Sequence, residues 1–172
     1  VLPAGQGQAP ARQASLGAGL PVSCGAVTIN KMCGSGMKAV MLGHDAIRAG
    51  SARIIVAGGM ESMTNAPYLL PRARAGYRLG HGQVLDHMFL DGLEDAYEPG
   101  RLMGSFAEDC AAAYGFDRAL QDRWALLSLH RARDAMQGAF ADEITPVETG
   151  GRSPRTVTED EQPLKADPDR IH

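Results

Sequence analysis

A strand–helix–strand pattern in the first third of the chain constrains the fold more than any other feature. Residues 26–29 (AVTI) and 53–57 (RIIVA) are short apolar, β-branched runs that predict buried strands. Between them, residues 34–49 carry apolar side chains at helical spacing, and Gly50 follows where a glycine commonly ends a helix. A strand, a helix and a strand within about 35 residues form a βαβ unit. We therefore expect an α/β fold with both strands parallel in one sheet and a right-handed crossover.

The remainder of the chain predicts helices separated by loops. Asp117 is a candidate N-cap for a long helix that runs to Gln137 and is ended by Gly138. Trp124 belongs to the apolar stripe of this helix, which we expect to be core rather than a binding surface. The other expected elements are a helix over 10–20, loop with short helices over 60–100, a helix over 103–114, short strands over 144–147 and 155–157, and loop from 158 onwards.

Composition excludes several classes of protein. The chain has 172 residues, of which 44% are apolar, enough for one domain with a core of its own. A net charge of −3 provides no basic face for nucleic acid, and no run of about 18 apolar residues is present to span a membrane. The three cysteines include no CxxC pair, which argues against a secreted disulfide framework and against a metal site. We therefore expect a reducing, cytoplasmic compartment.

Residues 30–38 (NKMCGSGMK) place Cys33 between the first expected strand and the first turn of the helix. Free N–H groups and the positive end of the helix dipole point to such a position, and they stabilise a thiolate, the nucleophilic form of cysteine. The small residues Gly34, Ser35 and Gly36 leave room for a large substrate to approach the sulfur and the backbone N–H groups. This arrangement suits a nucleophilic cysteine that forms a thioester while the backbone stabilises the oxyanion.

The residues alone leave two other interpretations of this segment open. A lone cysteine is most often a small buried hydrophobe. Cys24 and Cys110 lack the turn context of Cys33, and we interpret both as structural. Residues 34–39 (GSGMKA) also fit the GxGxxA variant of a dinucleotide-binding fingerprint. Against that fingerprint, four residues separate the strand from the first glycine. The second strand also ends in Gly58 and Gly59 rather than in an acidic residue.

Longer motifs in the chain resemble those of the thiolase family. Residues 30–40 (NKMCGSGMKAV) look like the nucleophile motif of that family, and residues 57–68 (AGGMESMTNAPY) look like its second signature at the right distance. Residues 91–93 (DGL), followed by Met103-Gly104, resemble its coenzyme A loop domain. The resemblance extends from about Pro10 to near Pro163.

The resemblance implies a fold and a reaction. It implies part of a thiolase-type N-terminal α/β half over residues 1–60 and most of an α+β, coenzyme A-binding loop domain over residues 61–172. The implied reaction is the reversible thiolysis of a 3-ketoacyl-CoA, or the Claisen condensation of acetyl-CoA, through a thioester on Cys33. The backbone N–H of Cys33 belongs to one oxyanion hole, and Leu93 and Met103 match positions that line the CoA or acyl pocket. Acyl-CoA is then a substrate rather than a bound cofactor, and the family implies a homodimer or homotetramer.

Two departures from the family pattern matter. Where the acetoacetyl-CoA branch has a histidine before the methionine of the loop-domain motif, this chain has Leu102. The family's activating histidine, second cysteine and water-ordering asparagine belong to motifs that do not occur in this sequence. We interpret the five histidines as structural or exposed: His44, His81, His87, His130 and His172. Two hypotheses follow: the chain is a segment of a longer, active thiolase, or it is a truncated, inactive protein that still binds CoA or a partner.

Two further groups of polar residues have both a functional and a structural interpretation. Glu61 and Asn65 follow the expected end of the second strand, where active-site groups often lie. Since they are signature residues, we expect them to hold the turn together instead. Four arginines face either CoA phosphates or a solvated or subunit-contact surface: Arg72, Arg74, Arg78 and Arg101.

Overall fold

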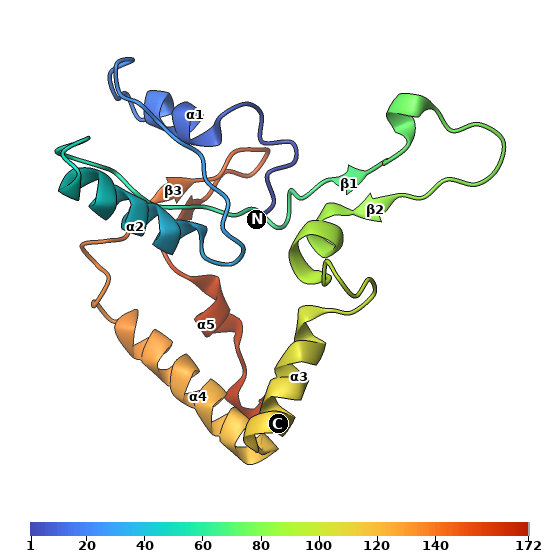
Figure 1. Cartoon of the computed structure of the whole chain (residues 1–172). Coiled ribbons are helices and arrows are strands. Elements are labelled where there is room, and N and C mark those ends of the chain that lie inside the picture. The colour runs from blue at the N-terminus through green and yellow to red at the C-terminus, as the bar shows by residue number, and fades with distance from the viewer. Residues whose placement is uncertain (172) are drawn as a thin grey trace. The chain divides into compact units, whose positions relative to one another are not determined.

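A computed structural model describes residues 1–171 of the chain, so His172, which the sequence predicts to be structural or exposed, lies outside the described residues. The chain forms two compact units, Val1–Ser105 and the part from Phe106 onward. Figure 1 shows the order of the helices and strands. In the described part of the chain, no helix is both long and apolar enough to cross a membrane.

The first unit contains α1 (Pro10–Gly17) and α2 (Ser35–Arg48), which lie where the sequence predicts helices. Gly50 follows α2 with a φ of 72°, a left-handed conformation that glycine adopts without strain. Its N–H donates a hydrogen bond to the Ile47 carbonyl at 3.1 Å. The predicted helix and its glycine end are therefore confirmed.

The prediction of two parallel strands in one sheet is wrong within residues 1–171, because the two apolar runs that flank α2 form no sheet there. Val27 in the first run is 80% exposed. In the second run exposure alternates, because Ile54 and Val56 are 88% and 87% exposed whereas Ile55 is 37% exposed. Ile55 lies against Gly43 of α2, where an added Cβ would come within 3.2 Å of Ile55 Cγ2. One face of this run is thus covered by α2, as in a βαβ unit. The predicted burial of both runs is wrong, because nothing among the described residues covers the rest.

A small antiparallel hairpin follows the second run. β1 (Tyr68–Leu69) pairs with β2 (Leu85–Asp86), and Tyr68 lies opposite Asp86. The intervening loop contains η1 (Ala73–Ala75), and η2 (Phe89–Leu93) follows β2 (Figure 1). The prediction of loop with short helices is confirmed, with this hairpin in addition.

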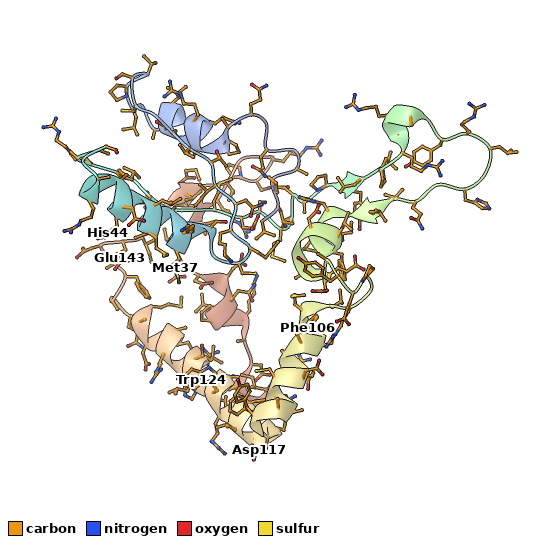
Figure 2. The ribbon with its side chains drawn as sticks, viewed as in Figure 1. Met37, His44, Phe106, Asp117, Trp124 and Glu143 are labelled. Carbon is orange, nitrogen blue, oxygen red and sulfur yellow. The ribbon has the colours of Figure 1, made fainter. Side chains whose placement is uncertain are left out.

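Two helices follow the hairpin region. α3 (Met103–Tyr114) begins in the first unit and continues into the second, where α4 (Arg118–Ala135) follows it. Asp117 lies at the start of α4 (Figure 2) and caps it as predicted, since its Oδ1 accepts a hydrogen bond from the Leu120 N–H at 2.7 Å. Both helices therefore confirm the sequence prediction.

The second unit ends in short elements. β3 (Val147–Glu148) pairs antiparallel with β4 (Thr156–Val157), close to the predicted strands. α5 (Glu161–Lys165) and η3 (Pro168–Arg170) lie where the sequence predicts loop, so that prediction is wrong. α5 forms because Asp160 accepts a hydrogen bond from the Gln162 N–H at 3.0 Å, and because Glu161 pairs with Lys165 one turn later.

The covered face of α4 is offset from the predicted apolar stripe. Trp124, labelled on α4 in Figure 2, is 68% exposed, whereas Leu129 is 9% exposed and buried. α5 packs against α4, and the Arg133 guanidinium donates to the Pro163 carbonyl at 2.9 Å and to the Ala166 carbonyl at 2.6 Å. Leu129 and Arg133 are one turn apart on the same side of α4. The predicted burial of the Trp124 stripe is therefore wrong, because these contacts turn the Leu129 side toward α5.

Little of the apolar surface is covered. The solvent-accessible surface is 14203 Å², against roughly 8,000 Å² for a compact globule of this mass and roughly 10,000 Å² for two separate units. The buried residues of the described chain are few: Leu2, Gly43, His87, Leu129 and Pro163. The expectation of a self-contained core is wrong. Local turns, glycine contacts and hydrogen bonds position the site instead.

Candidate active site

Cys33 lies at the third position of a tight turn that leads into α2. The Gly34 N–H donates to the Lys31 carbonyl at 2.9 Å, which closes a β-turn over residues 31–34. Cys33 has a φ of 54°, a left-handed conformation that costs a residue other than glycine about 1–2 kcal/mol. Its thiol is exposed. The turn therefore presents the sulfur at the surface, immediately before the helix.

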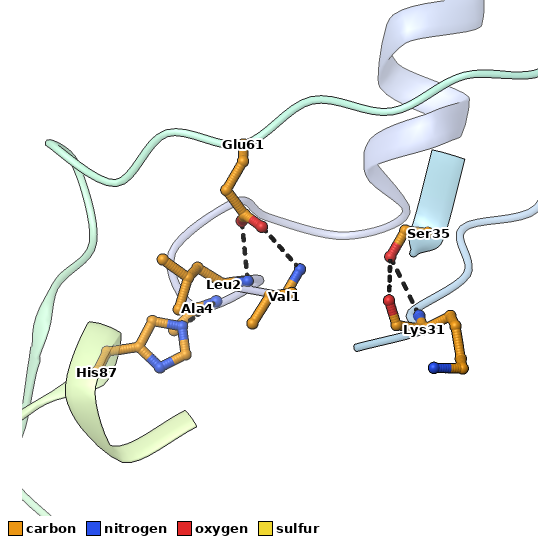
Figure 3. A network of polar contacts seen from close by, with 7 residues as sticks. All are labelled: Val1, Leu2, Ala4, Lys31, Ser35, Glu61 and His87. Atoms are coloured by element: carbon orange, nitrogen blue, oxygen red, sulfur yellow. Dashed lines mark hydrogen bonds and ion pairs between the residues drawn. The ribbon is translucent and has the colours of Figure 1, made fainter. Parts of the chain in front are cut away.

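The Ser35 hydroxyl closes the same turn from the helix side (Figure 3). Ser35 Oγ accepts a hydrogen bond from the Lys31 N–H at 3.1 Å and donates one to the Lys31 carbonyl at 3.1 Å. The sequence reasoning treats Ser35 only as a small residue, so it misses this contact. The available signal is a serine at the first position of a predicted helix, four residues after the residue whose backbone it bonds.

The N-terminus of α2 is open. Gly34, its N-cap, supplies no side-chain hydrogen bond, and no acidic residue lies in the first turn. The Lys38 N–H bonds within the helix, to the Gly34 carbonyl at 2.9 Å. The N–H groups ahead of Lys38 have no side-chain cap in the described chain, and they point along the helix axis toward the Cys33 end. Such groups stabilise negative charge on a thiolate or an oxyanion.

Gly59, which follows the second apolar run, lies against the start of α2. An added Cβ on Gly59 would lie 3.6 Å from both Cα and N of Gly36, so the two backbones approach closely. Together with the contact between Ile55 and Gly43, this places residues 55–59 alongside α2, running in the opposite direction. The structure therefore brings the glycines around the cysteine and those at the end of the second run together.

Glu61 and Asn65 make structural contacts, as the sequence predicts. The Glu61 carboxylate accepts hydrogen bonds from the Leu2 N–H at 2.9 Å and from the Val1 amino group at 3.0 Å (Figure 3). The Leu2 N–H, and after it the Val1 amino group, hold the pKa of Glu61 below its ordinary value. Asn65 Nδ2 donates to Ser62 Oγ at 3.0 Å within its own turn.

A buried histidine connects η2 to the same first residues. His87 is 3% exposed, and its Nδ1 lies 2.5 Å from Asp91 Oδ2. Its Nε2 accepts a hydrogen bond from the Ala4 N–H at 3.4 Å, the contact that Figure 3 shows. With Nε2 as the acceptor, Nδ1 is the ring atom that donates to Asp91. Leu2 packs beside it, 3.4 Å from an added Cβ on Gly92. The structural interpretation of His87 is confirmed. The exposed histidines are His44, His81 and His130.

Leu93 and Met103 lie at the two ends of one closed loop. Leu93 ends η2, Met103 begins α3, and an antiparallel bridge joins Glu94 to Leu102 between them. Leu93 and Met103 each adjoin a bridged residue, so the structure brings them together at the neck of the loop. Leu93 is half-buried and Met103 is 42% exposed. Neither is joined to Cys33 by a hydrogen bond, and their part in substrate binding stays a prediction.

The four candidate arginines have different surroundings. Arg101 forms an ion pair with Glu98 of its own loop, with Nη1 and Oε2 2.9 Å apart. The other three are exposed in the loop between β1 and β2: Arg72, Arg74 and Arg78.

Residues 1–168 match the family described as Thiolase, N-terminal domain. The chain belongs to the thiolase family. A solved structure of the Acat5 thiolase from Ascaris suum in complex with coenzyme A superposes with a TM-score of 0.87 at 41% sequence identity. The match covers 99% of this thiolase chain and 43% of that structure's chain. The predicted family and the α/β fold class are therefore confirmed.

Curated relatives of this thiolase chain are acetyl-CoA acetyltransferases. That of Pseudomonas aeruginosa is 51% identical over 166 residues, which cover 95% of this chain and 42% of the relative. That of Schizosaccharomyces pombe is 48% identical over 175 residues, which cover 99% of this chain and 44% of the relative. The chain thus spans about two fifths of the length of these relatives.

Proposed function

We propose that the protein that carries this chain is an acyl-CoA acyltransferase of the acetyl-CoA acetyltransferase kind, with Cys33 as its nucleophile. The observation that carries the proposal is the exposed cysteine in a left-handed turn at the open N-terminus of α2, in a chain of the thiolase family. The similarity to named acetyl-CoA acetyltransferases, at about 50% identity over most of the chain, supports it.

The proposed reaction begins with attack of Cys33 Sγ on the keto carbon of a 3-ketoacyl-CoA. The S–C bond forms, the bond between the second and third acyl carbons breaks, and acetyl-CoA leaves once its carbanion is protonated. Free coenzyme A then takes the acyl group from the thioester. The open N–H groups at the start of α2 and the N–H of Cys33 stabilise the oxyanion. The proton transfers need the histidine and second cysteine that the family places in motifs absent from this sequence.

The same proposal covers the substrate pocket, the division into domains, the oligomeric state and the compartment. Leu93 and Met103 line the CoA or acyl pocket, and residues 61–172 form the coenzyme A loop domain beside a partial N-terminal domain over residues 1–60. Their pairing at the neck of one loop and the likeness to a thiolase solved with coenzyme A support this assignment. We further propose a homodimer or homotetramer that acts in fatty acid metabolism in the cytoplasm.

The test is thiolysis of acetoacetyl-CoA by the purified protein, with Cys33→Ser as the test variant and Cys110→Ser as the matched control. Both cysteines are exposed, so both substitutions make the same chemical change at the surface. We expect the Cys33 variant to lose thiolysis and the Cys110 variant to keep it. Thiolysis that survives Cys33→Ser contradicts the proposal.

Two alternatives give different results in the same preparation. An intact mass near 18.2 kDa without thiolysis indicates the truncated, inactive protein, whereas a larger mass with thiolysis indicates the longer enzyme. A dinucleotide-binding protein would bind NAD(P) after Cys33 is alkylated. Selective labelling of Cys33 by iodoacetamide, with protection by acyl-CoA, removes the support for that alternative.

A further inference from the structure

We infer that Ser35 is a positioning residue for the nucleophile: its hydroxyl holds the turn that presents Cys33 at the start of α2. The inference rests on the proposed function, since it assumes that Cys33 carries the acyl group. It goes beyond that proposal by assigning a role to a side chain that does not itself react.

The geometry of the contact supports this role. Ser35 Oγ accepts from the Lys31 N–H and donates to the Lys31 carbonyl, both at 3.1 Å (Figure 3). The same carbonyl accepts the Gly34 N–H at 2.9 Å. The hydroxyl therefore joins the first residue of the turn to the first residue of the helix, and Cys33 lies between these two fixed points.

The conformation of Cys33 explains why the turn needs such a contact. A φ of 54° is unfavourable for a residue with a Cβ, so the backbone stays in it only where neighbouring contacts hold it there. The described chain offers little packing at this place, since Lys31, Met32 and Cys33 are all exposed. Hydrogen bonds to Lys31 are thus what holds the turn, and the Ser35 hydroxyl makes two of them.

The Ser35 contact matters for catalysis because it fixes the position of the Cys33 sulfur. The sulfur of Cys33 has to stay aligned with the open N–H groups of α2 for the helix end to stabilise a thiolate. A turn that relaxes to negative φ moves the sulfur away from that alignment while α2 remains folded. Loss of the Ser35 hydroxyl should therefore reduce the reactivity of Cys33 more than the stability of the protein or its affinity for substrate.

The experiment compares Ser35→Ala with Ser35→Thr, which keeps a hydroxyl, and with Ser51→Ala as the matched control. Ser51 follows the other end of α2, and its hydroxyl makes no hydrogen bond within residues 1–171. The readouts are kcat and KM for acetoacetyl-CoA thiolysis, and the rate of Cys33 alkylation by iodoacetamide, resolved by peptide mass spectrometry. Cys24 and Cys110 serve as reference thiols in the same molecule.

We expect Ser35→Ala to lower kcat about tenfold with little change in KM, as is typical when a reacting group is misplaced by a fraction of an ångström. Cys33 should be alkylated more slowly while Cys24 and Cys110 keep their rates. Ser35→Thr should restore most of kcat, and Ser51→Ala should resemble the unaltered protein.

Three results would overturn the inference: an unchanged kcat in Ser35→Ala, equal losses in the Ala and Thr variants, or increased alkylation of all three cysteines, which indicates general loosening. A failure of the proposed function gives a different result from these three, because in that case the Cys33→Ser variant retains thiolysis. If Cys33→Ser is inactive and Ser35→Ala is fully active, the proposed function stands and this inference alone is wrong.

Discussion

Replacement of Asp117 by alanine is expected to open the first turn of α4. The Asp117 carboxylate accepts the Leu120 N–H at 2.7 Å, and its charge lies at the positive end of the helix dipole. Loss of an N-cap costs about 1 kcal/mol, and loss of the charge costs a further 0.5 kcal/mol or so. The expected total is about 1.5 kcal/mol for Asp117→Ala. Asp117→Asn keeps a capping oxygen, so we expect it to lose only about 0.5 kcal/mol.

The assay is native-state hydrogen exchange of the Leu120 amide, with the Leu129 amide in the middle of α4 as internal reference. A cost of about 1.4 kcal/mol corresponds to a factor of ten, so Asp117→Ala should reduce protection at Leu120 about tenfold. Asp117→Asn should reduce it about two- to threefold. The reasoning is refuted if both variants lose equal protection, which would mean that charge rather than the cap holds the turn. Unchanged protection at Leu120 would refute it as well.

Three further predictions concern contacts between segments. Arg133→Met removes the donors to two carbonyls of the α5 region, so we expect faster proteolysis there with α4 intact. His87→Phe removes both hydrogen bonds of the buried ring, to the Ala4 N–H and to Asp91, and we expect it to lower the free energy of unfolding by about 2 kcal/mol, more than Asp91→Asn, in denaturant titration. The Leu2 N–H lowers the pKa of Glu61 in the folded protein. The Glu61 carboxylate therefore stabilises the fold above about pH 4.3, the pKa of an unfolded glutamate, and this stabilisation is lost as the pH falls through the lower pKa of the folded state. Glu61→Gln should flatten the stability profile in that range.

Each of these predictions has a contrary result. Uniform proteolysis of the Arg133 variant along the chain would show that the two hydrogen bonds do not specifically hold α5. A His87→Phe variant as stable as the unaltered protein would show that the ring serves only to fill space. An unaltered acid profile in Glu61→Gln would mean that other carboxylates account for the acid sensitivity.

The elements that follow from local signals could be predicted from the sequence. The helix from Ser35 to Arg48 ends where Gly50 adopts a left-handed conformation, and Asp117 caps the next long helix, because both signals act within one turn of the chain. Burial could not be predicted in this way. Trp124 lies in an apolar stripe, but contacts from Arg133 to a distant segment decide which side of α4 is covered.

In the candidate site, too, some features follow from the residue types and others depend on how the chain folds. Cys33 and the two glycine motifs are recognisable because their residue types carry the chemistry and the close approach. The left-handed conformation of Cys33 depends on how the turn closes, and the residue type at that position does not predict it. The Ser35 contact has a sequence signal, a serine at the start of the predicted helix, but the sequence prediction treats that serine only as a small residue. The edge of α2 that Ile55 contacts was predictable as a βαβ packing, but the exposure of Ile54 was not. A sequence pattern says which side chains prefer burial, not whether anything covers them.

The most direct test of the central claim is the site of acyl transfer. The protein is incubated with acetyl-CoA, quenched in acid and analysed by peptide mass spectrometry for a thioester-bound acetyl group. We predict one acetyl group on the peptide that contains Cys33, removed by added coenzyme A, and none on the peptides that contain Cys24 or Cys110. Acetylation of either of those cysteines instead, or thiolysis that proceeds while Cys33 stays unmodified, would contradict it.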